Sequence, residues 1–179
     1  VVDWMRVGFI HGVMNTDNTS ISGESFDYGP CSFINNYDAN TVYSSIDHNG
    51  RYAFGNQPKI IKWNILRFAE ALLPIIHQNE KKSIQLAQSV IEKFEEYWEK
   101  TYYSMMLKKI GFKNHDIALY ALVDELLNLM KKLKMDYNNT FYFLSQDNFE
   151  TNQISTNNEF IEWKKKWNKS IKKTNSLND

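Results

Sequence analysis

Cysteine is almost absent from this chain. Cys31 is the only one among 179 residues, which excludes an internal disulfide bond and a zinc site built from several thiolates. An excess of one charge is missing as well, because Lys and Arg total 21, Asp and Glu total 21, and the formal net charge is zero. Nucleic-acid-binding domains carry surplus positive charge, so this balance predicts no nucleic-acid partner.

Long apolar runs are also missing. No stretch approaches the roughly 20 consecutive apolar residues that a membrane-spanning helix needs, and the first residues show no secretory signal pattern. Hydrophobic residues nevertheless make up 42% of the chain and aromatic residues 15%, which is typical of a packed core. A single cysteine fits a reducing compartment. Together these features predict a cytoplasmic protein without a membrane partner.

Glycine is scarce after the first third of the chain. Six of the seven glycines precede residue 56, among short segments rich in Asp and Asn. Glycine permits positive φ and close backbone approach, so residues 1–58 are predicted to be loops and short strands that shape a site. Within them, Ser20–Asp27 has Ile21 and Phe26 on either side of Gly23 and is interpreted as a small β-hairpin.

After Pro58 the apolar residues recur every three or four positions, which predicts helices. Four such segments cover residues 60–73 (ending near Pro74), 87–98, 117–133 (after Asn114 as the N-cap) and 160–167. Their tryptophans and tyrosines are predicted to be core, and residues 164–166, all lysine, to face solvent or else a partner. We therefore expect one mainly α (α+β) domain fragment, with a catalytic and metal-binding segment at 1–58 and a helical bundle at 59–179.

Two polar clusters carry the chemistry, His11–Asn18 and Phe26–Pro30. Asn18 and Asp27 offer hard oxygen ligands nine residues apart, on either side of the predicted hairpin. Magnesium prefers such oxygens and often takes one or two protein ligands together with phosphate oxygens. Protein kinases hold their metals with an Asn and an Asp from two loops. Asn18 and Asp27 are therefore the predicted metal ligands.

The spacing of a kinase catalytic loop is only partly kept. His11 and Asn18 lie seven residues apart, as the corresponding His and Asn do in kinases, and residues 27–29 (Asp-Tyr-Gly) are similar to the metal-binding Asp-Phe-Gly. Val13, however, stands where the catalytic Asp is expected, and a valine side chain cannot accept a proton. The kinase template therefore disfavours ordinary phosphate transfer.

Three ordered motifs are more specific than that template: residues 11–18 (HGVMNTDN), 27–30 (DYGP) and 50–58 (GRYAFGNQP). In this order and spacing, and with Trp63-Asn64 following, they resemble the selenoprotein O (YdiU) family. The resemblance implies the C-terminal lobe of a protein-kinase-like fold in a bacterial cytoplasmic protein. It also implies a protein adenylyltransferase, which binds ATP in a flipped orientation and moves AMP onto Ser, Thr or Tyr side chains of proteins.

The resemblance further assigns roles to individual residues. Asn18 and Asp27 would hold Mg²⁺ or Mn²⁺ on the ATP phosphates, and Asp17 would be the candidate catalytic base. Other readings of these residues stay open: Asp17 as a hydrogen-bond acceptor for loop amides, Asn18 as a cap, and His11 as a prop for the loop or a proton carrier. Arg51 would pair with a carboxylate or touch phosphate.

Parts of the family architecture are expected to lie outside the chain. Ten residues before His11 are too few for a glycine-rich phosphate loop, and no cysteine lies near Asp179, where family members often carry a redox-active selenocysteine or cysteine. We expect the isolated chain to bind nucleotide weakly and to be inactive. The alternatives are an ordinary phosphotransferase, a non-catalytic ATP-binding pseudokinase and a helical interaction module.

Overall fold

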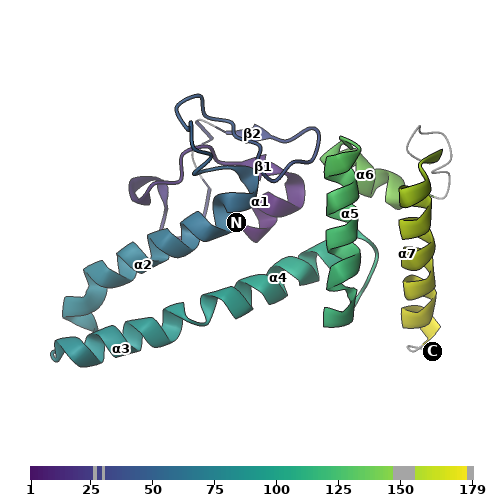
Figure 1. Cartoon of the computed structure of the whole chain (residues 1–179). Coiled ribbons are helices and arrows are strands. Elements are labelled where there is room, and N and C mark those ends of the chain that lie inside the picture. The colour runs from purple at the N-terminus through teal and green to yellow at the C-terminus, as the bar shows by residue number, and fades with distance from the viewer. Residues whose placement is uncertain (26–27, 30, 147–155, 177–179) are drawn as a thin grey trace. The chain divides into compact units, whose positions relative to one another are not determined.

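The computed structural model describes residues 1–25, 28–29, 31–146 and 156–176 (Figure 1). They form two compact units. Unit 1 contains Val1–Met5, Phe9–Phe33 and Ala39–Glu99, and unit 2 contains Arg6–Gly8, Ile34–Asp38 and Lys100–Asp179. The division of the sequence after Pro58 concerns composition and stays a prediction.

Unit 1 is built on a two-stranded antiparallel sheet and two long helices. After the short helix α1 (Val2–Val7), strand β1 (Phe9–Ile10) pairs with β2 (Ser32–Phe33), with Phe9 opposite Phe33. Both β1 residues are buried. The expected hairpin at Ser20–Asp27 is not seen, because residues 20–25 form a turn without a strand, and Phe26 and Asp27 lie outside the described residues. The strands instead bracket the whole segment 11–31.

Helix α2 (Gln57–Ile76) follows the single turn η2 (Phe54–Asn56). Pro58 lies in the first turn of α2, where a missing N–H costs no helical hydrogen bond. The expectation that the helix ends near Pro74 is confirmed, since α2 ends two residues later, at Ile76. A proline so near the helix end disturbs only the last turn, which is why the helix tolerates it.

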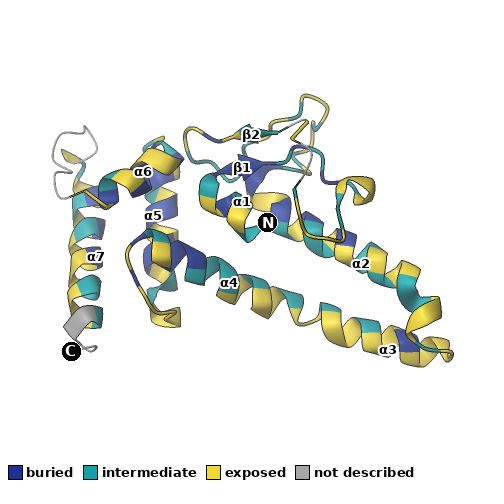
Figure 2. Ribbon diagram, turned by 180° about the vertical axis from the view of Figure 1, so that it is seen from behind, coloured by how far each residue is buried: buried dark blue, intermediate teal, exposed yellow. Residues whose placement is uncertain are grey.

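Helix α3 (Glu80–Ile91) packs against α2. Asn79 caps α3 by accepting a hydrogen bond from Lys82 N, and the buried Ser83 Oγ donates to Leu73 O at 2.6 Å. A new helix, α4 (Phe94–Lys109), begins two residues after α3, so the periodic segment 87–98 is two helices rather than one. Tyr97 is 72% exposed, and its assignment to the core is wrong. Figure 2 shows how much of α3 is exposed.

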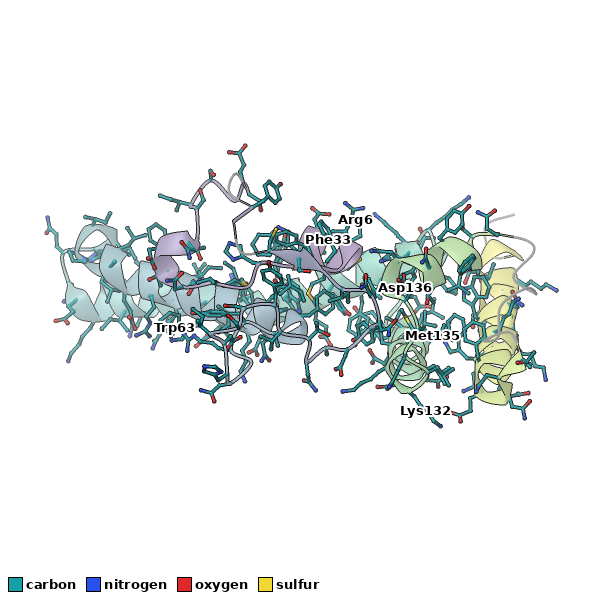
Figure 3. The ribbon with its side chains drawn as sticks, turned by 90° about the horizontal axis from the view of Figure 1, so that it is seen from above. Arg6, Phe33, Trp63, Lys132, Met135 and Asp136 are labelled. Atoms are coloured by element: carbon teal, nitrogen blue, oxygen red, sulfur yellow. The ribbon has the colours of Figure 1, made fainter. Side chains whose placement is uncertain are left out.

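Unit 2 is helical. It contains η3 (Ile117–Leu119), α5 (Tyr120–Lys132), α6 (Tyr137–Leu144) and α7 (Asn158–Ser176). The N-cap before η3 is Asp116, which accepts a hydrogen bond from Ala118 N, and not the expected Asn114. Helix α6 was not expected, and it begins at Asp136, which caps it by accepting from Asn139 N. Asp136 also forms a β-bridge with Asn36, and Figure 3 labels it.

The expectation that the tryptophans of α7 are core is confirmed. Trp163 and Trp167 are 2% and 9% exposed, and their rings stack with centroids 5.8 Å apart. Trp163 Nε1 donates to Leu122 O at 2.9 Å, which ties α7 to α5. On the solvent side, Lys166 pairs with Glu125 of α5. The lysines at 165 and 166 are exposed, as expected.

The described chain is mainly helical with one small sheet, which confirms the predicted mainly α (α+β) class; the kinase-like lobe stays a prediction. Among the described residues, no helix is both long and apolar enough to cross a membrane.

Replacing Trp163 with Ala should lower the free energy of unfolding of unit 2 by about 3–5 kcal/mol, because it opens a cavity and leaves Leu122 O without a donor. Urea denaturation followed by near-ultraviolet circular dichroism measures this loss. Lys165→Ala, an exposed change on the same helix, should stay within about 0.5 kcal/mol of the parent. Equal losses in the two variants would contradict the assignment of Trp163 to the core.

Candidate functional site

The loop after β1, residues 11–19, carries the predicted site residues Asp17 and Asn18. Gln57, at the start of α2, holds the beginning of this loop. Its side chain is fully buried and binds two main-chain groups on one edge of the chain: Nε2 donates to Phe9 O at 3.0 Å, and Oε1 accepts from His11 N at 3.0 Å. A neighbouring strand would satisfy the same two groups in the same way. Among the described residues no third strand pairs with β1, so Gln57 takes that place and fixes the point at which the loop leaves the sheet.

Asn64 holds the loop a second time, two turns further along α2. It is 3% exposed, and its Nδ2 donates both to Met14 O at 3.0 Å and to Thr19 Oγ1 at 2.7 Å. Thr19 Oγ1 in turn donates to Asn15 O at 3.1 Å. A spacing of seven residues places Gln57 and Asn64 on one helix face, with the buried Ile60 between them. One face of α2 thus binds the two ends of the loop.

Between these two supports, the loop makes its own hydrogen bonds. His11 Nδ1 accepts from Val13 N at 3.3 Å, and the His11 ring lies 5.5 Å from that of Trp4. These contacts are what a histidine that props the loop would make. Asn15 supports the following turn with its main chain, since Asn15 O also accepts from Asn18 N at 3.1 Å.

Asn18 ends this turn, η1 (Thr16–Asn18), and its side chain is oriented by one contact. Its Nδ2 donates to Val13 O at 3.1 Å, whereas its Oδ1 accepts no hydrogen bond from any described residue. The side chain is exposed. The amide nitrogen therefore fastens the side chain to the loop, and the oxygen, the atom that a hard cation prefers, remains available.

Asp17 lies beside Asn18 in the same turn and is exposed. Its carboxylate makes no hydrogen bond or ion pair with the residues that the structure describes. No contact among the described residues therefore supports the alternative in which Asp17 accepts hydrogen bonds from loop amides. An exposed carboxylate next to a free amide oxygen can accept a proton or bind a cation.

Asp27, the other predicted metal ligand, lies outside the described residues, so its distance to Asn18 is not part of the site geometry. The described residues contain no group of three or more His, Cys, Asp or Glu side chains close enough to hold a metal ion. Magnesium at a nucleotide site often takes only one or two protein ligands, with phosphate and water completing its shell. Asn18 Oδ1 fits the role of one such ligand.

The motif at Gly50–Pro58 is mainly structural. Both carboxylate oxygens of Asp47 accept from the main chain, from Arg51 N and Tyr52 N, each at 2.8 Å. A Cβ at Gly55 would lie 2.9 Å from Ala39 Cβ, closer than real contacts allow, so this position requires glycine. Asn56 Nδ2 donates to Gly50 O at 2.7 Å. The motif thus folds a compact loop that delivers Gln57 to the start of α2.

Arg51 of this motif forms no ion pair with a carboxylate in the described part of the chain, and its contact with phosphate stays a prediction. Its guanidinium carbon lies 4.9 Å from the centre of the Trp63 ring and 5.7 Å from that of Tyr52. Arg67, one turn along α2, lies 5.4 Å from the same Trp63 ring. Figure 3 shows Trp63 projecting from α2. An aromatic ring flanked by two guanidinium groups is a cationic surface feature.

A pocket of about 480 Å³ belongs to unit 2, where α5 and α7 line it with residues that include Glu125, Lys132 and Trp163. Neither Asp17 nor Asn18 is among the residues that line this pocket.

Sequence reasoning missed the two residues that position the loop. Gln57 and Asn64 lie seven residues apart on α2: Gln57 comes three residues before the predicted apolar spacing begins at residue 60, and Asn64 lies within it. A buried side-chain amide needs hydrogen-bond partners, so two amides on an apolar face indicate that a backbone segment lies against them. This pattern was the available signal.

Nearly the whole chain, including the site residues named above, is similar to known proteins. The family model described as "Protein adenylyltransferase SelO" matches residues 1–178. Three proteins described as "Protein nucleotidyltransferase YdiU" are similar to the chain: one from Pelagibacter ubique is 53% identical over 96% of the chain, and those from Bacillus cereus and Clostridium beijerinckii are 48% identical over 93% and 92%. The matches cover 35%, 34% and 34% of these relatives, so the chain spans about a third of their length.

Replacing Asn64 with Ala should loosen the loop, because Met14 O and Thr19 Oγ1 then lose their donor. We expect a loss of about 1–3 kcal/mol in the free energy of unfolding of unit 1, with faster amide hydrogen exchange at residues 11–19. Lys59→Ala, an exposed change on the same helix, is the matched control. Unchanged exchange in the loop of the Asn64 variant would show that Asn64 does not hold it.

Proposed function

The chain belongs to the SelO family of protein adenylyltransferases, and from this premise we propose that it supplies the metal-binding part of an ATP site that transfers AMP to proteins. Because the chain spans only about a third of the length of these relatives, this activity is proposed for the whole protein and not for the 179 residues alone. The observation that carries the proposal is the exposed pair Asp17 and Asn18, on a loop that α2 fastens at both ends.

In this proposal Asn18 and Asp27 hold Mg²⁺ or Mn²⁺ against the phosphates of ATP. The support for Asn18 is its free Oδ1, which the hydrogen bond from its own Nδ2 to Val13 O keeps away from the loop backbone. Support for Asp27 is the Asp-Tyr-Gly sequence and the family membership of the chain. A divalent cation held there would neutralise charge on the phosphates and on the departing pyrophosphate.

Asp17 is proposed as the general base. Its carboxylate would take the proton from the hydroxyl of a Ser, Thr or Tyr side chain while that oxygen bonds to the α-phosphorus of ATP. The bond from the α-phosphorus to the bridging oxygen then breaks, and pyrophosphate leaves. The support for this role is that Asp17 is exposed and makes no competing contact with the described residues.

Val13 favours AMP transfer over phosphate transfer. In a kinase, the residue at this position accepts the proton of the acceptor hydroxyl as the γ-phosphate moves. Val13 cannot do so, and its main chain is engaged by His11 Nδ1 and Asn18 Nδ2. A site in which Asp17 serves as the base, four residues later in the chain, suits a nucleotide bound in the flipped orientation, with its α-phosphorus facing the acceptor.

The full-length protein should carry label from ATP labelled at the α-phosphate onto a protein acceptor or onto itself, in the presence of Mg²⁺ or Mn²⁺. Label at the γ-phosphate should not be transferred. Asp27→Ala should reduce the transfer at least about 100-fold, because charge neutralisation by a metal is worth several kcal/mol. Scintillation counting of the separated protein measures both labels, and Lys59→Ala is the control.

The other outcomes of this experiment decide between the alternatives. Transfer of γ-label would mean an ordinary phosphotransferase despite Val13. No transfer from either position, with ATP still bound, would mean a non-catalytic ATP-binding pseudokinase. If no label is transferred and ATP does not bind, the helical interaction module is the remaining alternative. The isolated 179-residue chain, which contains no glycine-rich phosphate loop before His11, should transfer no label under the same conditions.

A further inference from the structure

Two arginines of unit 1 share one exposed aromatic ring. The guanidinium carbons of Arg51 and Arg67 lie 4.9 Å and 5.4 Å from the centre of the Trp63 ring. Arg51 comes from the loop before α2, whereas Trp63 and Arg67 lie one turn apart on α2 itself. We call these three residues the Arg–Trp patch. Stacking on an indole holds a planar guanidinium in place and leaves its edge, with the N–H donors, free for a ligand.

The Arg–Trp patch has more positive charge than its surroundings neutralise. Arg67 pairs with Glu70 at 2.7 Å, but none of the carboxylates in the described part of the chain forms an ion pair with Arg51. Main-chain contacts fix the position of Arg51, since Asp47 accepts a hydrogen bond from its N–H. Trp63 is 39% exposed. The patch is therefore a preorganised cation and aromatic surface that lacks one anionic partner.

The composition of the patch favours a polypeptide over a small free ion. An exposed guanidinium binds a free anion weakly, because water and salt screen the charge. A polypeptide adds apolar contact with the exposed part of the Trp63 ring, which is 39% exposed. Trp and Arg are the residue types most enriched where protein interfaces concentrate their binding energy. A carboxylate matches the paired N–H groups of a guanidinium.

We propose that the Arg–Trp patch docks an acidic segment of the polypeptide that accepts AMP. A carboxylate of the acceptor binds Arg51, and the acceptor backbone or an apolar side chain covers Trp63. This inference rests on the proposed function, because it names how that function recognises its acceptor.

Helix α2 connects the patch to the site. Asn64, the next residue after Trp63, is turned by about 100° around the helix axis and binds the loop that carries Asp17. The helix thus presents the proposed docking surface on one face and holds the catalytic loop with another. An acceptor that docks on Trp63 and Arg51 is bound to the same rigid element that positions the proposed base, which favours a fixed geometry between them.

The test measures binding without nucleotide, using the full-length protein. The probe is a fluorescent random copolymer of glutamate and tyrosine, which is acidic and carries hydroxyl groups, and fluorescence anisotropy gives its dissociation constant. Arg51→Ala should weaken binding roughly fivefold, as expected for one partly exposed charge pair, and Arg51→Lys should recover only part of the loss. Lys81→Ala, which removes an exposed charge from α3, should leave the dissociation constant unchanged.

Four results would overturn the inference. These are an unchanged dissociation constant for Arg51→Ala, an equal loss for Lys81→Ala, equal binding of a lysine–tyrosine copolymer, and displacement by inorganic phosphate but not by acetate at the same ionic strength. The last would identify a phosphate site. If the rest of the protein covers the patch, Arg51→Ala will lower the melting temperature and leave binding unchanged, which also overturns the proposal.

The same variants separate this inference from the proposed function. Labelling from α-labelled ATP should show a higher KM for the glutamate–tyrosine copolymer in Arg51→Ala, with an unchanged KM for ATP. Absence of AMP transfer in every variant, together with weaker copolymer binding by Arg51→Ala, would remove the proposed reaction and leave the docking site. Normal AMP transfer by Arg51→Ala, with unchanged copolymer binding and an unchanged KM for the copolymer, would retain the proposed reaction and remove the docking site.

Discussion

Everything proposed for this chain depends on two buried side-chain amides of α2. Gln57 binds the main chain at Phe9 and His11, and Asn64 binds Met14 O and Thr19 Oγ1. Backbone groups of a loop that leaves a two-stranded sheet have few partners, and a buried group without one is costly. Carboxamides satisfy such groups without adding charge: Gln57 uses both its donor and its acceptor, and Asn64 uses the two N–H groups of its Nδ2.

The rest of unit 1 follows from that arrangement. The loop before α2 is compact because Asp47 and Asn56 bind its main chain and because Gly55 allows close contact with Ala39. It starts the helix at the point where Gln57 reaches β1. With its ends fastened, the loop keeps the Asp17 carboxylate and the Oδ1 of Asn18 exposed and without partners among the described residues, a state that a free loop would leave by forming its own hydrogen bonds.

The helical character and the family could be predicted from the sequence, because apolar spacing and motif order are local, whereas the roles of Asp17, Asn18 and Asp27 stay predictions. It did not allow the sheet to be placed: β1 and β2 are two residues each, too short for alternation to show, and their pairing joins positions more than 20 residues apart. Val90 and Tyr97 follow the helical period but are exposed, since periodicity identifies a face and not what covers it. The split of segment 87–98 into two helices likewise has no glycine or proline to mark it.

We propose that Asn18, held by this loop, binds the metal of the nucleotide together with Asp27. The direct measurement is an anomalous difference map from crystals of the full-length protein with Mn²⁺ and an ATP analogue whose α,β-bridge resists cleavage. We expect a manganese peak about 2.0–2.5 Å from Asn18 Oδ1 and from a carboxylate oxygen of Asp27. A manganese ion on the phosphates that is bonded to neither side chain would contradict it.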